Sequence, residues 1–255
     1  NLIVFDFKSL YPSVIRTFNI DPLMITNKGK GVISSPAEFY FKNEEGILPA
    51  IIGELWRERE IFRKNKDEIG RYAVKILMNS FYGAVASPLS RYFNRALGNS
   101  ITLNCQFMIK NTAQLIREKG YEVIYGDTDS IFVVSKAKDL ADARTIGKKI
   151  EKEINDHYDS WIKKEFGRKS FLELEFEKTY TKFLLPMVRG GTKGAKKRYA
   201  GLLEGKKVDV VGMEAVRGDW TELAKKYQRE VLDKVFHDKE VLKYTQEFVE
   251  KIRNG

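Results

Sequence analysis

The chain has 255 residues, 43% of them hydrophobic and 31% charged, and this ordinary globular composition argues against disorder over the whole length. One cysteine and two histidines exclude an intrachain disulfide and a zinc-ribbon cluster, and they argue against a histidine-rich metal site. The net charge of +10 favours polyanionic partners, nucleic acid first and a membrane surface second. No apolar run approaches the roughly 18 residues of a membrane span. A start at Asn1 rather than Met predicts a piece of a longer protein.

The N-terminal part of the chain predicts a strand followed by irregular structure. Residues 2–7 form an apolar run typical of a buried strand, and Asp6 lies at its end. Pro12 lacks an N–H and fixes its φ angle, so residues 9–13 are expected to turn the chain. Glycines and prolines lie among polar residues over 27–46, which predicts a loop.

Two helices are expected next, the first beginning near Leu48-Pro49 and the second covering residues 71–82, with a break at 66–70. Gly83 is expected to end the second helix. Its apolar residues have the spacing of a packed stripe: Val74, Leu77, Met78 and Phe81. Its hydrogen-bond donors fall on another face: Arg71, Lys75, Asn79 and Tyr82.

The rest of the chain alternates between helical and β-rich patterns. We expect a helix over 98–118 capped by Gly120, followed by a hairpin of 121–125 and 130–135 around an acidic turn. An amphipathic helix is expected over 139–166, and strands over 171–189 and 197–212 with a turn at 204–206. The last expected elements are helices over 219–253 that break near His237 and Asp238.

Three aspartates are candidates for metal chemistry. Asp6 follows a buried strand, where such residues more often cap a turn than bind a metal. Asp127 and Asp129 share one hairpin turn, where their charges repel unless a divalent cation such as Mg²⁺ or Mn²⁺ neutralises them. A third carboxylate from another strand would complete a two-metal site for in-line phosphoryl displacement.

Two basic segments are candidates for phosphate binding. The face of Lys75, Asn79 and Tyr82 is either solvated or suited to a triphosphate and a base, with Arg59 and Arg63 adding charge. The basic residues around the glycine-rich stretch 190–194 form either a solubilising loop or a track for a phosphate backbone: Lys193, Lys196, Lys197 and Arg198.

Four segments occur in the order of the motifs of the family B DNA polymerases and resemble them. Residues 6–13 (DFKSLYPS), 75–83 (KILMNSFYG) and 125–130 (YGDTDS) look like motifs A, B and C, and residues 196–199 (KKRY) are similar to the primer-binding motif. The resemblance runs to about Tyr227, and residues 212–220 resemble the start of the family's thumb. The short segment 48–83 and residues 196–201 look most like the bacterial DNA polymerase II branch.

The resemblance implies a role for each matching residue. Asp6 and Asp129 would bind two Mg²⁺ ions, or Mn²⁺ in their place, with the Phe7 carbonyl joining the metal shell and Asp127 in a lesser catalytic role. The incoming dNTP would contact Ser9, Leu10, Tyr11, Arg59, Arg63, Lys75, Asn79 and Tyr82. Primer–template DNA would contact Thr128, Lys196, Lys197, Arg198 and Tyr199. From its charge and position, rather than from the resemblance, Lys75 is also expected to be catalytic, as a proton donor to the leaving group. Arg63 departs from the family, where a lysine is usual, and Glu173 and Glu175 lie in a strand that carries an acidic residue near the site in relatives.

The implied fold is α+β: an antiparallel palm sheet with packed helices (1–47 and 84–212), two fingers helices (48–83) and the start of a helical thumb (213–255). The implied activity is that of a DNA-directed DNA polymerase in the cytoplasm of a bacterium or archaeon, associated with the nucleoid. Exonuclease, N-terminal and distal thumb regions would be missing from this chain, and a sliding clamp is a further candidate partner. The rival interpretations are a non-catalytic nucleic-acid-binding fragment and another two-metal enzyme, such as a nucleotide cyclase.

Overall fold

The computed structural model describes residues 1–30, 32–188, 190 and 194–254. It divides into two compact units, each described by itself below. The central unit comprises Phe5–Ile131 and Lys148–Phe176, and the C-terminal unit comprises Asn1–Val4, Phe132–Gly147 and Glu177–Gly255. Among the described residues, no helix combines the length and the apolar character needed to span a membrane.

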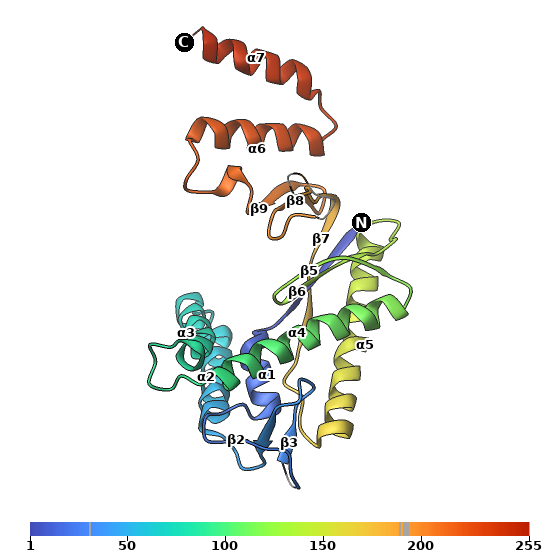
Figure 1. The fold of residues 1–255 in the computed structure, drawn as a ribbon. Coiled ribbons are helices and arrows are strands. Elements are labelled where there is room, and N and C mark those ends of the chain that lie inside the picture. The colour runs from blue at the N-terminus through green and yellow to red at the C-terminus, as the bar shows by residue number, and fades with distance from the viewer. Residues whose placement is uncertain (31, 189, 191–193, 255) are drawn as a thin grey trace. The chain divides into compact units, whose positions relative to one another are not determined.

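The chain is a mixture of helices and sheet, as the sequence predicted (Figure 1). The main sheet has the strand order β5-β6-β1-β7-β8-β9. Its strands are β1 (Leu2–Phe7), β5 (Glu122–Asp127), β6 (Ser130–Val134), β7 (Leu174–Leu184), β8 (Tyr199–Leu203) and β9 (Lys207–Val211). Strands β1, β6 and β7 each have residues in both units. Every residue of β1 except Asp6 is buried, which explains its almost unbroken apolar sequence.

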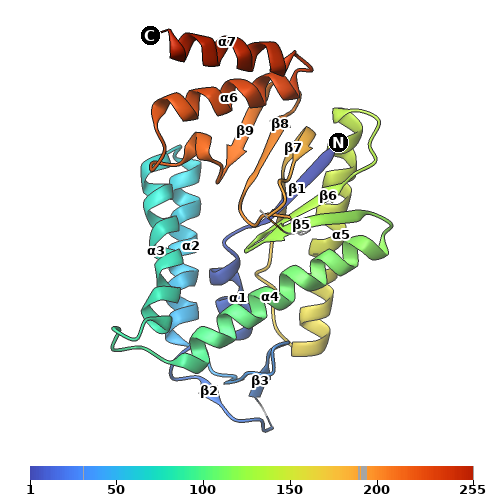
Figure 2. The same cartoon turned by 45° about the horizontal axis from the view of Figure 1, so that its top comes forward.

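Helices make up most of the central unit: α1 (Leu10–Phe18), α2 (Ile47–Lys64), α3 (Glu68–Ala86), α4 (Arg95–Glu118) and most of α5 (Leu140–Phe166). Helices α2 and α3 pack side by side (Figure 2). The Asp67 carboxylate accepts a hydrogen bond from the Gly70 amide, and this cap starts α3. The Asn94 side chain caps α4 in the same way, so α4 begins three residues before the predicted start.

Four expectations about the central unit are wrong. Residues 10–13 begin α1 rather than a turn, because a proline in the first turn removes an N–H that has no helical partner. The expected loop 27–46 contains β3 (Val32–Ser34) and β4 (Tyr40–Lys42), which join β2 (Ile25–Thr26) in a small sheet. Gly83 lies inside α3, and Leu77 is 49% exposed. The packed stripe of α3 is Val74, Met78 and Val85.

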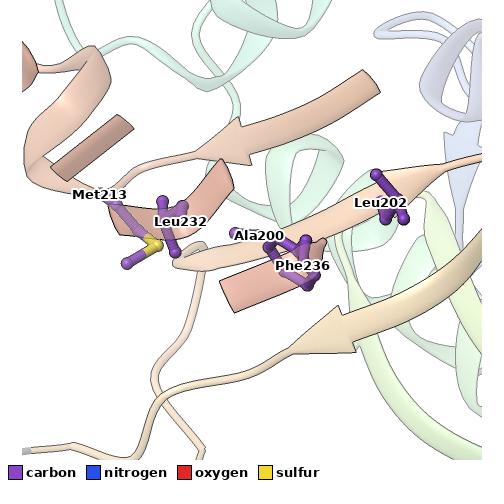
Figure 3. Packing of buried hydrophobic residues seen from close by; sticks show 5 residues of the cluster. All are labelled: Ala200, Leu202, Met213, Leu232 and Phe236. Atoms are coloured by element: carbon purple, nitrogen blue, oxygen red, sulfur yellow. The ribbon is translucent and has the colours of Figure 1, made fainter. Parts of the chain in front are cut away.

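The C-terminal unit holds the β8–β9 hairpin and helices α6 (Glu222–Phe236) and α7 (Val241–Arg253). The hairpin turn at 204–206 and the helix break near His237 are confirmed. Strand β7 is shorter than the predicted 171–189, and Arg189 lies outside the described residues. A small core joins α6 to β8 (Figure 3): Ala200, Leu202, Met213, Leu232 and Phe236.

Candidate nucleotidyl-transfer site

The ends of two strands bring two of the predicted carboxylates onto neighbouring segments. Asp6 is the fifth residue of β1, and the amide of the next residue, Phe7, donates a hydrogen bond of 2.9 Å to the backbone carbonyl of Asp129. Both aspartates are partly buried. The pairing therefore places the Asp6 end of β1 beside the hairpin turn between β5 and β6.

The hairpin turn is held by its own backbone and hydroxyl groups. The Asp129 amide donates to the Asp127 carbonyl at 2.6 Å, and Ser130 Oγ donates to the same oxygen at 3.2 Å. Thr128 has a φ of 53°, in the left-handed region, and its hydroxyl donates to Asp127 Oδ1 at 3.3 Å. Asp127 thus takes part in the turn itself, whereas Thr128 is exposed at the tip.

The charge of Asp129 acts on the partly buried Tyr11 and the buried Cys105. Burial is the main cause that raises the pKa of Tyr11 and of the Cys105 thiol, and the negative charge of Asp129 raises both further. In the part of the chain that the structure describes, no group of three or more His, Cys, Asp or Glu side chains is placed to hold a metal ion. The donor set of two carboxylates and the Phe7 carbonyl is nonetheless hard oxygen, which fits Mg²⁺ or Mn²⁺.

Two tyrosines predicted to contact the nucleotide lie against each other. The ring of Tyr11, in the first turn of α1, meets the ring of Tyr82 on α3 edge to face, with centroids 5.0 Å apart. Each is partly exposed. The contact joins segments that lie far apart in the sequence and belong to two different motifs.

A basic hollow of about 110 Å³ lies in the central unit. Its lining residues are Lys8, Arg59, Glu60, Arg63, Arg71 and Glu175. Arg59 Nη1 donates to Ser9 Oγ at 3.0 Å, which connects α2 to the residue that precedes α1. Arg63 pairs with Glu60 at 2.5 Å, so part of its charge is already compensated.

The electrostatic environment of Arg59 is unfavourable to its own charge. Burial is the main cause that lowers its pKa, and the nearby positive charge of Arg71 lowers it further. An anion in the hollow would relieve both effects, because it would supply hydrogen-bond acceptors and negative charge. The exposed Lys75 and Asn79 lie on α3 and do not line the hollow.

Sequence reasoning assigned no role to Lys8 and did not place Arg71 at the nucleotide, yet both line the hollow. Lys8 Nζ lies 3.2 Å from Glu173 and 3.8 Å from Glu175, and 5.9 Å from the ring centroid of Trp56. Glu173 and Glu175, which the resemblance drew attention to as acidic residues of this strand, are therefore paired with a lysine. The sequence did contain a signal for each missed residue: Lys8 lies two residues after Asp6, and Arg71 lies one helical turn before Lys75.

The predicted DNA-binding segment lies in the C-terminal unit, with Lys196 and Lys197 exposed. Lys193, counted with them, lies outside the described residues. Tyr199 packs its ring against Phe132 and Phe183, with centroids 5.2 and 5.4 Å away.

Arg198 has a structural partner. It forms an ion pair with Glu214, which also accepts a hydrogen bond of 2.9 Å from Gln228. The Gln228 hydrogen bond, together with Glu214's own backbone and Arg198, lowers the pKa of Glu214 to about 2. The charge of Arg198 is thus compensated by Glu214 within the C-terminal unit.

Gly212 permits the backbone path of this segment. Its φ is +62°, and a β-carbon there would lie 1.8 Å from the Lys197 carbonyl oxygen. Any side chain would force the two backbones apart. Lys197 itself has a left-handed φ of 56°.

The chain is similar to known proteins over its whole length. The family model described as DNA polymerase family B matches residues 1–255. The chain is 37% identical to DNA polymerase II of Escherichia coli strain K12, over 100% of this chain and 34% of that protein. It is 31% identical to a DNA polymerase of Thermococcus gorgonarius, over 99% of this chain and 33% of that protein.

A solved structure of the family B DNA polymerase from the archaeon Pyrobaculum calidifontis aligns with a TM-score of 0.62 at 25% identity, covering 99% of this chain and 32% of that one. The chain spans about a third of the length of the curated relatives it matches. With the family model matching from end to end, the chain belongs to DNA polymerase family B.

Proposed function

We propose that this chain is the catalytic core of a DNA-directed DNA polymerase, in which a primer 3′-hydroxyl attacks the α-phosphorus of a dNTP and pyrophosphate leaves. The observation that carries the proposal is the hydrogen bond from the Phe7 amide to the Asp129 carbonyl, because it sets Asp6 and Asp129 on adjoining strand ends. Metal-assisted displacement at a phosphorus atom requires carboxylates that lie close enough together to hold divalent cations, and adjoining strand ends can supply them.

The metal-binding residues of the proposal are Asp6, Asp129 and the Phe7 carbonyl. Two divalent cations held there would lower the pKa of the attacking hydroxyl and neutralise charge on the phosphates. Asp127 supports the turn that presents Asp129.

The triphosphate would bind over the start of α1 and the basic hollow. The amides of Ser9 and Leu10 begin a helix, where N–H groups have no helical partner and favour phosphate oxygens. Arg59 would bind a phosphate while remaining bonded to Ser9, and Arg63 would add charge at longer range. Lys75 and Asn79, exposed on α3, would contact the triphosphate, and Lys75 would protonate the leaving pyrophosphate.

The sugar and base of the nucleotide would contact the pair formed by Tyr11 and Tyr82. The primer strand would contact Lys197 and Tyr199, with Lys196 and Thr128 exposed for further phosphate contacts. In this proposal residues 1–47 and 84–212 form the palm, 48–83 the fingers and 213–255 the beginning of the thumb.

Primer extension tests the proposal. The parent chain, a labelled primer–template and Mg²⁺ should give template-directed addition, whereas Asp129→Asn should lower incorporation by more than about 100-fold because a metal ligand is lost. Duplex affinity should stay nearly unchanged, since phosphate contacts dominate it. The matched control is Asp156→Asn on α5, at an exposed position.

The same assay separates the rivals. Duplex binding without incorporation by the parent chain would favour the nucleic-acid-binding fragment. Mg²⁺-dependent release of pyrophosphate from a nucleotide without a primer would favour a cyclase. Incorporation by Asp129→Asn within a few-fold of the parent would remove Asp129 from the metal site.

A further inference from the structure

A second cavity in the central unit is lined by three arginines and has a volume of about 500 Å³. It lies among the C-terminal half of α1, the beginning of α2 and the segment that follows α5. We call it the arginine cavity; its charged and aromatic lining residues are Arg16, Glu45, Glu54, Arg57, Arg168 and Phe171. It shares no lining residue with the basic hollow.

Arg16 carries a partly buried guanidinium that has no hydrogen-bond acceptor among the described residues. Its guanidinium lies 3.7 Å from the ring centroid of Phe171, and a β-carbon built at Gly53 would lie 3.6 Å from Nη2. It forms no ion pair and donates no hydrogen bond to any residue that the structure describes. Burial, and then the positive charge of Arg57, lowers its pKa. Guanidinium donors withdrawn from water without an acceptor are costly, and a ligand oxygen would satisfy them.

The other two arginines differ in how they are held. Arg168 donates from Nε to the Thr17 carbonyl at 2.6 Å and from Nη2 to the Arg16 carbonyl at 3.3 Å, which fixes it at the end of α1. Arg57 on α2 has a side chain that is 75% exposed and lies 3.9 Å from Glu54. The cavity thus has one fixed, one unsatisfied and one adaptable guanidinium.

Glu45 and Glu54 reduce the positive charge of the cavity but do not remove it. Three cations face two carboxylates, and Glu54 makes only the long contact with Arg57. The beginning of α2 also lines the cavity, but the Asp21 carboxylate already accepts a hydrogen bond of 2.8 Å from the Leu48 amide there, so the binding of a ligand depends on the arginines. A ligand that binds in the arginine cavity has to accept hydrogen bonds from several guanidinium groups that lie on different sides of it.

We propose that the arginine cavity binds a phosphate group through the guanidinium groups of Arg16 and Arg57, with Arg168 as the fixed third donor. A tetrahedral phosphate offers oxygens to donors on several sides, and the planar fork of a guanidinium matches two of them. The phosphate is carried either by a free ion or by a single strand of nucleic acid. This site is separate from the proposed polymerase site and does not depend on it.

The test measures binding without divalent metal, which removes metal-dependent binding at the proposed nucleotide site, and the cavity variants separate the arginine cavity from the basic hollow, with which it shares no lining residue. Inorganic phosphate is titrated by calorimetry, and a labelled oligothymidylate without terminal phosphates is titrated by fluorescence anisotropy. The variants are Arg57→Gln and Arg16→Gln, with Arg117→Gln, exposed at the end of α4, as the matched control. Since Arg57 is exposed, its variant keeps the test valid even where Arg16→Gln fails to fold.

We expect both cavity variants to weaken binding by about tenfold or more, as losing one charge-assisted hydrogen bond does, while Arg117→Gln changes little. Loss of phosphate binding alone identifies a free ion, and loss of oligothymidylate binding identifies a strand. Equal effects of all three variants, or no effect of the cavity variants on either probe, would overturn the proposal. Because neither probe requires incorporation, failed primer extension with intact phosphate binding would reject the polymerase proposal and leave this one standing.

Discussion

Arg59 and Arg198 were both predicted to face a phosphate, yet their surroundings differ. Arg59 is bonded to the neutral Ser9 hydroxyl and forms no ion pair among the described residues, and Arg71 opposes its charge more than either Glu60 or Glu175 supports it. Arg198 is paired with Glu214, which Gln228 also holds. The difference teaches that a basic residue in a motif becomes informative only when its partner is known. A compensated arginine stabilises the fold, and an uncompensated one is available to a ligand.

The first prediction tests whether the backbone holds the Lys197 segment. Gly212→Ala should destabilise the chain by about 3 kcal/mol, through a strained φ and a clash with the Lys197 carbonyl. The measurement is the free energy of unfolding in urea. Gly218→Ala is the matched control, because a β-carbon there would meet nothing within 4 Å. Equal stabilities of the two variants would contradict the close approach.

The second prediction concerns the compensated arginine. Glu214→Gln should cost about 1–2 kcal/mol at neutral pH, because a charged acceptor is lost. The folded pKa of Glu214 is about 2 and its ordinary value is 4.5, so the charged form stabilises the fold above pH 4.5. That contribution is lost as pH falls from 4.5 to 2.

Thermal unfolding of parent and variant across this pH range is the check. The difference in Tm should shrink toward zero at the acid end. Glu222→Gln, which removes an exposed carboxylate from its pair with Lys225, should change Tm little at any pH. A constant difference for Glu214→Gln would assign its effect to packing rather than to charge.

The third prediction tests the contact of Tyr11 with Tyr82. If the Tyr11 ring lies under the sugar, Tyr11→Ala should raise the use of ribonucleotides relative to deoxynucleotides by about tenfold or more, since a steric barrier at the 2′-hydroxyl is removed. Tyr11→Phe keeps the ring and should keep the ratio. Single-nucleotide incorporation measures both. An unchanged ratio with a lowered Tm would mean that Tyr11 only packs.

The smallest expected effect is at Lys197. Lys197→Ala should weaken primer–template binding for all sequences and reduce the slope of log K against log salt by about 0.9, the value of one duplex phosphate. Anisotropy titrations across salt concentrations measure the slope. Lys152→Ala, an exposed lysine on α5, should leave it unchanged. Equal slopes for Lys197→Ala and the parent would make Lys197 a solvated residue.

Much of the fold was predictable because long elements carry a clear period. The hairpin around Asp127–Asp129 and the helix 139–166 appear where the apolar pattern places them. Strands β2, β3 and β4 were missed because two or three residues are too few to show alternation. The end of the second helix was predicted too early, at Gly83, because a glycine often ends a helix. Helix α3 instead continues through Gly83 to Ala86, and a β-carbon at Gly83 would meet nothing within 4 Å.

The candidate site was predictable only as separate motifs. Similarity to the motifs identifies Asp6, Tyr11, Tyr82 and Asp129 as candidates. Their spacing in the sequence does not predict which of them touch. The contact of Tyr11 with Tyr82 and that of Arg59 with Ser9 are seen only in the structure. Lys8 and Arg71 reach the basic hollow through the packing of α2 against its neighbours, which no local pattern encodes.

Trp56 gives the central unit a built-in optical reporter. Its ring centroid lies 5.9 Å from Lys8 Nζ, which lines the basic hollow, and 5.7 Å from the guanidinium of Arg16, which lines the arginine cavity. A cation over an indole shifts the energies of its electronic states, so neutralising either cation should shift the emission of this residue. One native fluorophore thus senses the electric field of two phosphate-binding candidates without any added label.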